Sequence, residues 1–322
     1  MTRRILVTGG SGFIGTNLVQ HYVDLGCEVL NLDVMPPRNP HHAGHWQQID
    51  ILDLDRLRAA TQAFQPELMF HMAARTDLAG SSVADYRANT EGVANVVDVA
   101  RELAALRGVV FASSMLVCEL GYLPRDEFDF RPTTPYGESK VLGEGIVRRE
   151  AAGAIPWVIA RPTSVWGPWF DVPYRSFFNA VARGLYLHPY GVRVRRSYGF
   201  VYNAVFILSK LAENVEHDAA GRVFYVADYE PVELRAWAEK IRRAMNAPRI
   251  RDVPLALLRV LARAGDALKR LGISNPPLSS FRLRNLLTEA VYDLEQTRAL
   301  CGELPVGVDE AISITVEWMR NH

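Results

Sequence analysis

The residues of this sequence best placed to do chemistry are a tyrosine and a lysine four positions apart, Tyr136 and Lys140, in the segment YGESK. Residues with this spacing share one face of a helix, so we expect the lysine charge to favour the phenolate of Tyr136. A phenol titrates near about pH 10, too high for proton exchange at neutrality without such help. The same spacing also arises on solvated helix faces. Here, however, Ser113-Ser114 supplies a second hydroxyl and a glycine-rich turn precedes both, an order that indicates nicotinamide-dependent redox chemistry.

The glycine-rich turn is the segment TGGSGFIG at residues 8–15, between an apolar strand pattern at 5–7 and a helical pattern at about 12–25. Glycines let the chain turn tightly, let a pyrophosphate approach the backbone, and let the helix pack close to the strand. The N-terminus of the helix then offers free N–H groups to phosphates. We therefore expect dinucleotide contacts from Gly9, Gly12, Phe13, Ile14 and Gly15.

An acidic residue indicates which dinucleotide is bound. Asp33 closes the second predicted strand, where a carboxylate accepts hydrogen bonds from the ribose hydroxyls and repels a 2′-phosphate. NAD is therefore expected rather than NADP, although Arg38 nearby weakens that preference. Asp50 ends a third predicted strand, and two interpretations stay open for it. Either it meets the adenine amino group, or it caps the helix that begins near Asp53.

The elements that must position these residues alternate between strands and helices. Such alternation predicts parallel pairing with right-handed crossovers, hence a doubly wound α/β sheet of the Rossmann type. After residue 167 the alternation fails, and from 231 the pattern is mainly helical. We expect an NAD-binding domain of residues 1–166 plus 201–228, and a smaller, mostly helical substrate lobe of 167–200 plus 229–322.

Composition narrows the class of protein. The 322 residues carry 36 basic and 36 acidic side chains, so no global positive field attracts nucleic acid. Three widely spaced cysteines fit a reduced, cytoplasmic setting and form no metal-type pair. The histidines at 41–45 have no acidic or cysteine partners nearby, so we expect no metal. No apolar run reaches the length of a membrane span, and no secretory signal is expected.

Taken together, these motifs resemble the extended short-chain dehydrogenases/reductases, specifically the NAD-dependent epimerase/dehydratase family. The resemblance covers nearly the whole chain and is strongest over residues 1–170. Each motif is modestly specific, but all of them in this order are highly specific. They are the turn at 8–15, HMAA at 71–74, Asn89, Ser113-Ser114, Tyr136 with Lys140, and RPTSVWGP at 161–168.

The resemblance implies roles for these residues. Ser114 and Tyr136 would hydrogen-bond the reacting sugar oxygen, Tyr136 would take or give its proton, and Lys140 would hold the nicotinamide ribose. Further NAD contacts are implied for Asp33, Asp50, Ile51, Met72, Ala73, Ala74, Asn89, Tyr136 and Lys140. Substrate contacts are implied for Thr76, Ser114, Arg196 and Arg282, the two arginines binding phosphate. The alternative for the arginines is that they are solvated surface residues.

The two residues directly after Ser114 indicate the member of the family. Dehydratases carry an Asp-Glu pair there, whereas this chain has Met115-Leu116, which cannot transfer protons. By elimination, the pocket resembles that of a simple epimerase or ketoreductase. The resemblance to the family then implies a nucleoside-diphosphate-sugar epimerase, most simply at C4. The alternatives are a 4-ketosugar reductase, a 3β-hydroxysteroid-type dehydrogenase and, from another class, a non-catalytic NAD-sensing regulator. Departures at Cys118, Trp166 and Asn203 bear on the substrate more than on the redox core.

Partners other than substrate are also suggested. In the family, helices corresponding to 85–106 and 136–152 commonly pair across a two-fold axis, so a homodimer is expected. The apolar stretch at 254–264 carries interspersed arginines and would suit a membrane interface. Apolar stripes at helical spacing are more often core, so membrane association is not expected.

Overall fold

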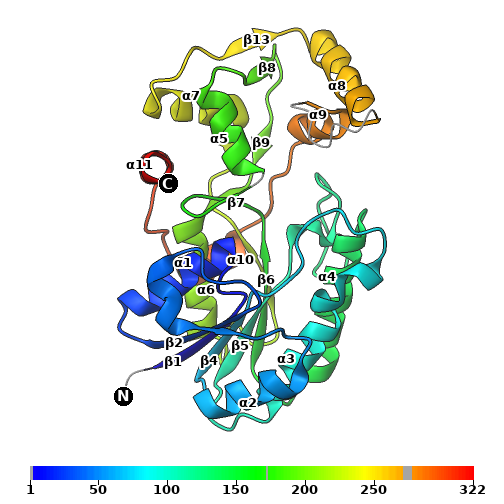
Figure 1. Cartoon of the computed structure of the whole chain (residues 1–322). Helices are drawn as coiled ribbons and strands as arrows, with labels where there is room; N and C mark the ends of the chain where they lie inside the picture. The colour runs from blue at the N-terminus through cyan, green and yellow to red at the C-terminus, as the bar shows by residue number, and fades with distance from the viewer. Residues whose placement is uncertain (1–2, 172, 271–277) are drawn as a thin grey trace.

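The computed structural model of the chain describes residues 3–171, 173–270 and 278–322. A seven-stranded sheet with helices on both faces forms its base, and a smaller group of helices and short strands lies above it (Figure 1). All neighbouring strands of the sheet are parallel. In order across the sheet, they are β11 (Val223–Val226), β6 (Trp157–Pro162), β5 (Gly108–Ala112), β4 (Leu68–His71), β1 (Arg4–Thr8), β2 (Glu28–Asp33) and β3 (Trp46–Gln48). The predicted doubly wound α/β fold is confirmed.

Two layers of apolar side chains hold helices against the two faces of the sheet. One layer includes residues of α1 (Phe13–Asp24) and α6 (Val201–Glu213), and the other includes residues of α2 (Leu54–Phe64) and α3 (Glu91–Arg101). Strands buried on both faces explain why the strand segments are nearly continuous apolar runs. The carboxyl ends of β1, β2, β4 and β5 therefore meet at one edge, which collects the predicted site residues.

Two predicted helices differ from the structure in their extent. The segment predicted as one helix at 85–106 is a 3-10 turn, η2 (Val83–Asn89), followed by α3, because Thr90 leaves helical geometry at φ −123° and ψ −76°. The segment 136–152 is α4 (Pro135–Ile146) and then a π-helical turn, η4 (Val147–Ala151).

The remaining elements belong largely to the upper part of the molecule. After β6 the chain leaves the sheet, and it returns to the sheet with α6 and β11. The exact division into two domains stays a prediction. The remaining helices and strands are β7 (Ser164–Trp166), α5 (Tyr174–Ala182), β8 (Leu187–Pro189), β9 (Arg195–Arg196), β10 (Tyr198–Phe200), β12 (Val232–Glu233), α7 (Leu234–Ala244), β13 (Arg251–Val253), α8 (Leu255–Arg270), α9 (Ser280–Leu287), α10 (Glu295–Cys301) and α11 (Val308–Asn321). Two further 3-10 turns are η1 (Pro40–His45) and η3 (Met115–Val117).

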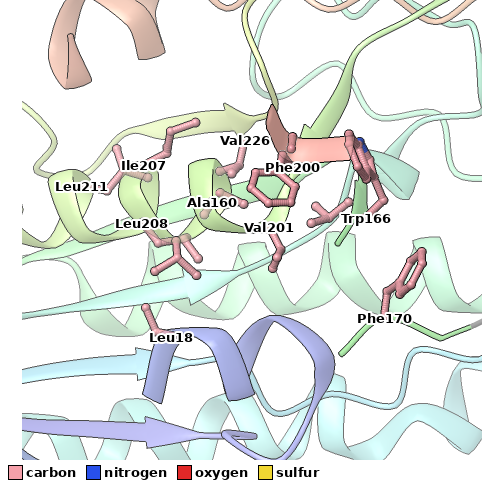
Figure 2. Packing of buried hydrophobic residues seen from close by; sticks show 14 of the residues in the cluster. Leu18, Ala160, Trp166, Phe170, Phe200, Val201, Ile207, Leu208, Leu211 and Val226 are labelled. Atoms are coloured by element: carbon pink, nitrogen blue, oxygen red, sulfur yellow. The ribbon is translucent and has the colours of Figure 1, made fainter. Parts of the chain in front are cut away.

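An aromatic cluster ties the upper part to the sheet. Figure 2 shows Trp166 and Phe200 beside the start of α6, whose Leu208 and Leu211 pack over the sheet. Trp166 is 1% exposed, and its ring centroid lies 5.4 Å from that of Trp237 on α7. The tryptophan that departs from the usual family tyrosine is thus a core residue that fixes the upper elements over the sheet.

Candidate active site

The glycine-rich turn joins β1 to α1 with little free space around it. Gly9 has φ +75°, and a Cβ added there would lie 2.4 Å from the backbone N of Ala73. A Cβ on Gly15 would lie 2.1 Å from the carbonyl oxygen of Gly9, so the helix could not pack this close to the turn with a side chain there. These two positions therefore require glycine for geometric reasons.

The same turn has the donors and the room that a dinucleotide needs. Gly12 is the N-cap of α1, and an added Cβ there would meet only one atom, the oxygen of Gly9, within 4 Å. The first-turn N–H groups of Phe13 and Ile14 have no acceptor within the helix, because an α-helix leaves its first amides free. The backbone is thus open to a phosphate, and the residues present fit NAD.

Asp33 at the end of β2 is bonded directly to the turn. Its Oδ2 accepts a hydrogen bond from the Ser11 N–H at 3.0 Å and its Oδ1 accepts one from Met35 at 2.9 Å. Burial raises the pKa of this carboxyl, and hydrogen bonds from the backbone oppose that rise. Arg38 donates through Nε and Nη1 to the carbonyls of Ser11 and Trp169, so it borders the same edge.

The two interpretations of Asp50 are separated by the structure. The N-cap of α2 is Asp53, whose side chain accepts from Arg56 N, so the interpretation of Asp50 as that cap is wrong. Asp50 instead accepts a local hydrogen bond from the Leu52 N–H and is exposed. Its neighbour Ile51 is buried, and the Ile51 carbonyl accepts from Asn95 on α3. Contacts of Asp50 and Ile51 with adenine stay predictions.

The loop after β4 carries Met72, Ala73 and Ala74 close to the glycine turn. Met72 N donates to the Thr8 carbonyl at 2.9 Å, and Ala73 lies against Gly9. Thr76, further along this loop, is exposed.

Asn89 holds this loop from behind. The Asn89 side chain is fully buried and bonds both the N–H and the carbonyl of Arg75. Its amide also donates to Ser139 Oγ at 2.9 Å, which joins the loop to α4. Asn89 therefore positions the loop, and a direct NAD contact by it stays a prediction.

Helix α4 presents Tyr136 and Lys140 on one buried face, as the spacing predicts. The helix begins at Pro135, and Thr134 caps it by accepting from Gly137 N at 3.0 Å. Tyr136 is 6% exposed, and the Ser114 side chain lies close enough to it to lower its pKa. Two hydroxyls from different elements thus meet at one point, as acid–base chemistry at a single oxygen requires.

The electrostatics of this pair differ from the sequence expectation. Burial raises the pKa of Tyr136 to about 12, and the nearby Ser114 side chain opposes that rise. Burial lowers the pKa of Lys140 to about 8, opposed by the nearby charge of Glu144. The ammonium of Lys140 donates to the carbonyl of Ala112 at 2.9 Å. In the protein without NAD, the expectation that the chain itself lowers the phenol pKa is wrong, because burial raises this pKa and the opposing contribution comes from Ser114.

Two residues behind Lys140 were missed by the sequence analysis. Glu144 and Arg161 form an ion pair of 2.8 Å with both side chains 1% exposed, and Ser113 Oγ donates to the same carboxylate at 2.6 Å. The available signal was the spacing, since Tyr136, Lys140 and Glu144 follow one another at four-residue intervals. Arg161 opens the motif at 161–168, but nothing in the sequence indicates its pairing with Glu144, because Arg161 lies on β6 and Glu144 on α4.

The predicted substrate arginines have different environments. Arg196 on β9 is 6% exposed and donates through Nη2 to the carbonyl of Asn285, so the alternative that it is a solvated surface residue is wrong. Arg282 is exposed in the first turn of α9, whose residues include Asn285. Tyr174 and Tyr292 are close enough to Arg196 for its charge to lower their pKa, although burial raises both overall.

The structure also shows the histidines at 41–45 and the apolar stretch at 254–264, which the sequence analysis considered for metal binding and for a membrane interface. His42 of the loop at 41–45 is buried and bonded to Gln20, and no group of three potential metal ligands occurs among residues 3–171, 173–270 and 278–322. Helix α8 spans the apolar stretch, with Leu258 and Ala262 buried and Val260 60% exposed. Across the part of the chain that is described, no helix has both the length and the apolar character to span a bilayer.

Comparison with known proteins agrees with this geometry. The model of the family described as "NAD dependent epimerase/dehydratase family" matches residues 5–227. The chain belongs to this family. It is therefore an enzyme of the epimerase/dehydrogenase kind, and its cofactor is NAD.

The relatives of this chain differ from one another in their named activities. The chain is 28% identical to a 3 beta-hydroxysteroid dehydrogenase/Delta 5-->4-isomerase of Mycobacterium tuberculosis, over 94% of this chain and 86% of that protein. It is 27% identical to a UDP-glucose 4-epimerase of Vibrio cholerae, over 77% of each. The solved UDP-glucose 4-epimerase of Thermus thermophilus in complex with NAD superposes with a TM-score of 0.74 at 23% identity, covering 98% of this chain and 99% of that one.

Proposed function

We propose that this enzyme epimerises a nucleoside-diphosphate sugar at C4 through a transient ketone. Bound NAD⁺ would accept hydride from the alcohol carbon and return it, and its positive ring would favour the phenolate of Tyr136. The residues that would hold NAD are the turn at 9–15, Asp33 and Lys140. Two observations support this assignment: the backbone at Gly12 is open, and the carboxylate of Asp33 is hydrogen-bonded to the turn.

Tyr136 and Ser114 would handle the proton at the reacting oxygen. The proximity of their side chains supports this role, because one substrate oxygen can then contact both hydroxyls. Tyr136 takes the proton of the hydroxyl as the carbon is oxidised and gives it back when the carbonyl is reduced. In the protein without NAD, Tyr136 has a pKa of about 12 and is protonated at neutral pH, the form that polarises a carbonyl. The positive charge of bound NAD⁺ would favour the phenolate that the oxidation step needs.

The observation that carries the substrate class is a pair of buried polar atoms. Arg196 Nε and the Tyr292 hydroxyl are buried and have no hydrogen-bond partner among the residues described. Such atoms need a ligand that supplies oxygen acceptors and hydroxyls, as diphosphates and sugars do, whereas a hydrocarbon would leave them unsatisfied. Tyr225, which stacks on Tyr292 with ring centroids 4.7 Å apart, continues this polar aromatic surface toward Arg161.

The test is a screen of nucleoside-diphosphate hexoses with the NAD-loaded enzyme, with sugar stereochemistry followed by NMR. We expect one substrate pair to interconvert to a mixture from either side. The nicotinamide absorbance should show no net change, because each turnover regenerates NAD. Failure of every nucleotide sugar in the panel would contradict the proposal.

A second candidate is a dehydrogenase of a bulky apolar alcohol. It is favoured by the apolar pair Met115-Leu116 directly after Ser114, and by the relative of that kind, which matches 94% of this chain. The exposed apolar residues of α8 and Phe281 of α9, at 57% exposure, would suit such a substrate. This enzyme would reduce NAD stoichiometrically with substrate, so a lasting absorbance change would favour it over the epimerase.

We also propose a two-fold homodimer that pairs α3 and α4. The support is Leu142 on α4, an apolar side chain that is 50% exposed in the single chain and that a partner helix would cover. Light scattering of the purified protein should give twice the mass of 36.0 kDa, and a monomer at micromolar concentration would contradict the pairing.

A further inference from the structure

A small cavity lies beside Lys140, where α3 and α4 face the sheet. Its volume is about 20 Å³, and its lining includes His71 of β4, Asn89 and Ser113 as well as Lys140 and Glu144. A cavity needs roughly 10–15 Å³ to hold one water molecule, and a water is stable there only with two or more polar partners. This cavity meets both requirements.

One ring nitrogen of His71, which lines this cavity, has no hydrogen-bond partner in the part of the chain that the structure describes. His71 is 2% exposed, and its Nδ1 is 2.8 Å from the hydroxyl oxygen of Thr8. The other ring nitrogen, Nε2, is buried and has no hydrogen-bond partner among the described residues. Buried nitrogens in native proteins are almost always bonded to protein or to ordered water, so Nε2 calls for a ligand in the cavity.

Lys140 also has unused donors at the same cavity. Its ammonium has three N–H groups, and in the part of the chain that is described only the carbonyl of Ala112 accepts from it. The Lys140 charge acts on His71, where it adds to burial in lowering the pKa to about 3. His71 is therefore neutral, and a neutral imidazole offers one acceptor nitrogen.

We propose that one water molecule occupies this cavity, accepts a hydrogen bond from the Lys140 ammonium and donates one to Nε2 of His71. In this arrangement Nδ1–H of His71 donates to the hydroxyl of Thr8. His71 is then a positioning residue, which holds Lys140 through the water. Thr8 immediately precedes Gly9, so the chain of bonds joins Lys140 to the turn that would bind NAD. The functional meaning of this link rests on the proposed role of Lys140, but the water site itself does not.

Besides this neutral histidine, few titratable groups among the described residues face Lys140. Glu144 lies on the same helix, and it is held by Arg161 from β6 and by Ser113, which directly follows β5. Tyr136 on the same helix stays neutral, and the residues of η2 and α3 at the cavity, Asn89 and Val93, carry no charge. A change at His71 therefore alters the solvation of Lys140 without adding or removing a formal charge.

The pKa of Lys140 reports on the water directly, because the water stabilises the charged amine. The chain has four lysines, Lys140, Lys210, Lys240 and Lys269, so NMR of protein with ¹³C-labelled lysine side chains gives few signals to titrate. Lys140 is assigned by the signal lost in Lys140→Met. The titration uses NAD-free protein and needs no substrate.

We expect His71→Leu to lower the Lys140 pKa by about one pH unit, since the water loses its acceptor. His71→Gln keeps an acceptor oxygen and should leave the pKa within about 0.3 of wild type. The matched control is His188→Leu, another buried histidine, bonded to Tyr186 and Val192 in the upper part of the molecule. It should leave Lys140 unchanged.

Equal Lys140 pKa values in wild type and His71→Leu would overturn the proposal. If His71→Leu does not fold, the wild-type enzyme decides the matter. A high-resolution crystal structure should place one water within hydrogen-bond distance of both Lys140 Nζ and His71 Nε2, and ¹⁵N NMR should show His71 protonated at Nδ1. An empty cavity, or the other tautomer, would refute the water bridge. A protein with this shift but no epimerase activity would reject only the proposed function.

Discussion

The carboxylate of Glu144 lies 2.8 Å from Nε of Arg161, and neither side chain is more than 1% exposed. Nη2 of Arg161 also donates to Glu144 Oε2 at 2.8 Å, so the pair is bidentate. Since Glu144 follows Lys140 by one helical turn, this pair locks the helix that carries the site onto β6. The buried charges thus fix the position of Lys140.

Removal of one member of this pair should destabilise the fold. Glu144→Ala leaves the Arg161 guanidinium buried and uncompensated, and we expect a loss of about 3–5 kcal/mol in the free energy of unfolding. Urea denaturation measures this. The double variant Glu144→Leu with Arg161→Met removes both charges and should recover most of the loss. A single variant that unfolds like the wild type would contradict the role of the pair.

Lys140 should give the NAD-free protein a distinctive pH dependence. Its pKa is lowered from 10.5 to about 8 by burial, so between pH 8 and 10 the unfolded chain binds more protons than the folded one. The free energy of unfolding should therefore rise with pH across this window, by up to about 3 kcal/mol, and fall again as the pH drops to 8. Lys140→Met should abolish this rise. Denaturant titrations at pH 8, 9 and 10 measure it, and a flat profile for the wild type would contradict the burial of a charged amine.

Several features of the site were readable from the sequence because they are local. The spacing of Tyr136 and Lys140 specified a shared helix face, and the glycine turn specified the β1–α1 junction. Other features depend on tertiary burial. The direction of the Tyr136 pKa shift follows from desolvation, which no local spacing reports. Arg161 reaches Glu144 only in the folded chain, because one lies on β6 and the other on α4.

The predicted fold was right in class and less accurate at helix ends. Alternating apolar runs specified the parallel sheet, but the break at Thr90 and the π turn after Ile146 carry no proline or glycine signal strong enough to locate them. The sequence left two roles open for Asp50, adenine contact or the cap of α2, and the cap is instead Asp53, three residues further on.

The glycine turn allows a test in which strain and crowding are separated. Gly9 and Gly26 have similar φ values of +75° and +70°, but an added Cβ at Gly9 would collide with Ala73, whereas at Gly26 nothing lies within 4 Å. Gly26→Ala should cost about 1 kcal/mol of stability and leave NAD binding intact. Gly9→Ala should cost more and abolish NAD binding, as calorimetric titration would show. Equal effects at both positions would indicate that backbone strain alone matters.

Arg196 should govern substrate affinity, whereas its neighbour Arg195 should not. Arg195 is exposed and paired with Glu289 at 3.2 Å, while Arg196 is buried with Nε unpartnered in the described residues. We expect Arg196→Gln to raise KM at least tenfold, because a charge-assisted bond is lost, with a smaller effect on kcat. Arg195→Gln is the matched control and should stay within about twofold of wild type. Melting temperatures verify folding, and an unchanged KM in folded Arg196→Gln would remove this residue from the substrate site.

The central claim is that the Tyr136 hydroxyl moves the proton at the reacting oxygen, and Tyr136→Phe tests it most directly. This change removes one oxygen from a buried ring and leaves the glycine turn and Asp33 intact. The measurement is single-turnover kinetics on protein whose NAD content is determined in the same sample. We predict normal NAD content and a rate reduced by about 10²–10⁴-fold. A variant that retains NAD and turns over at the wild-type rate would contradict the account.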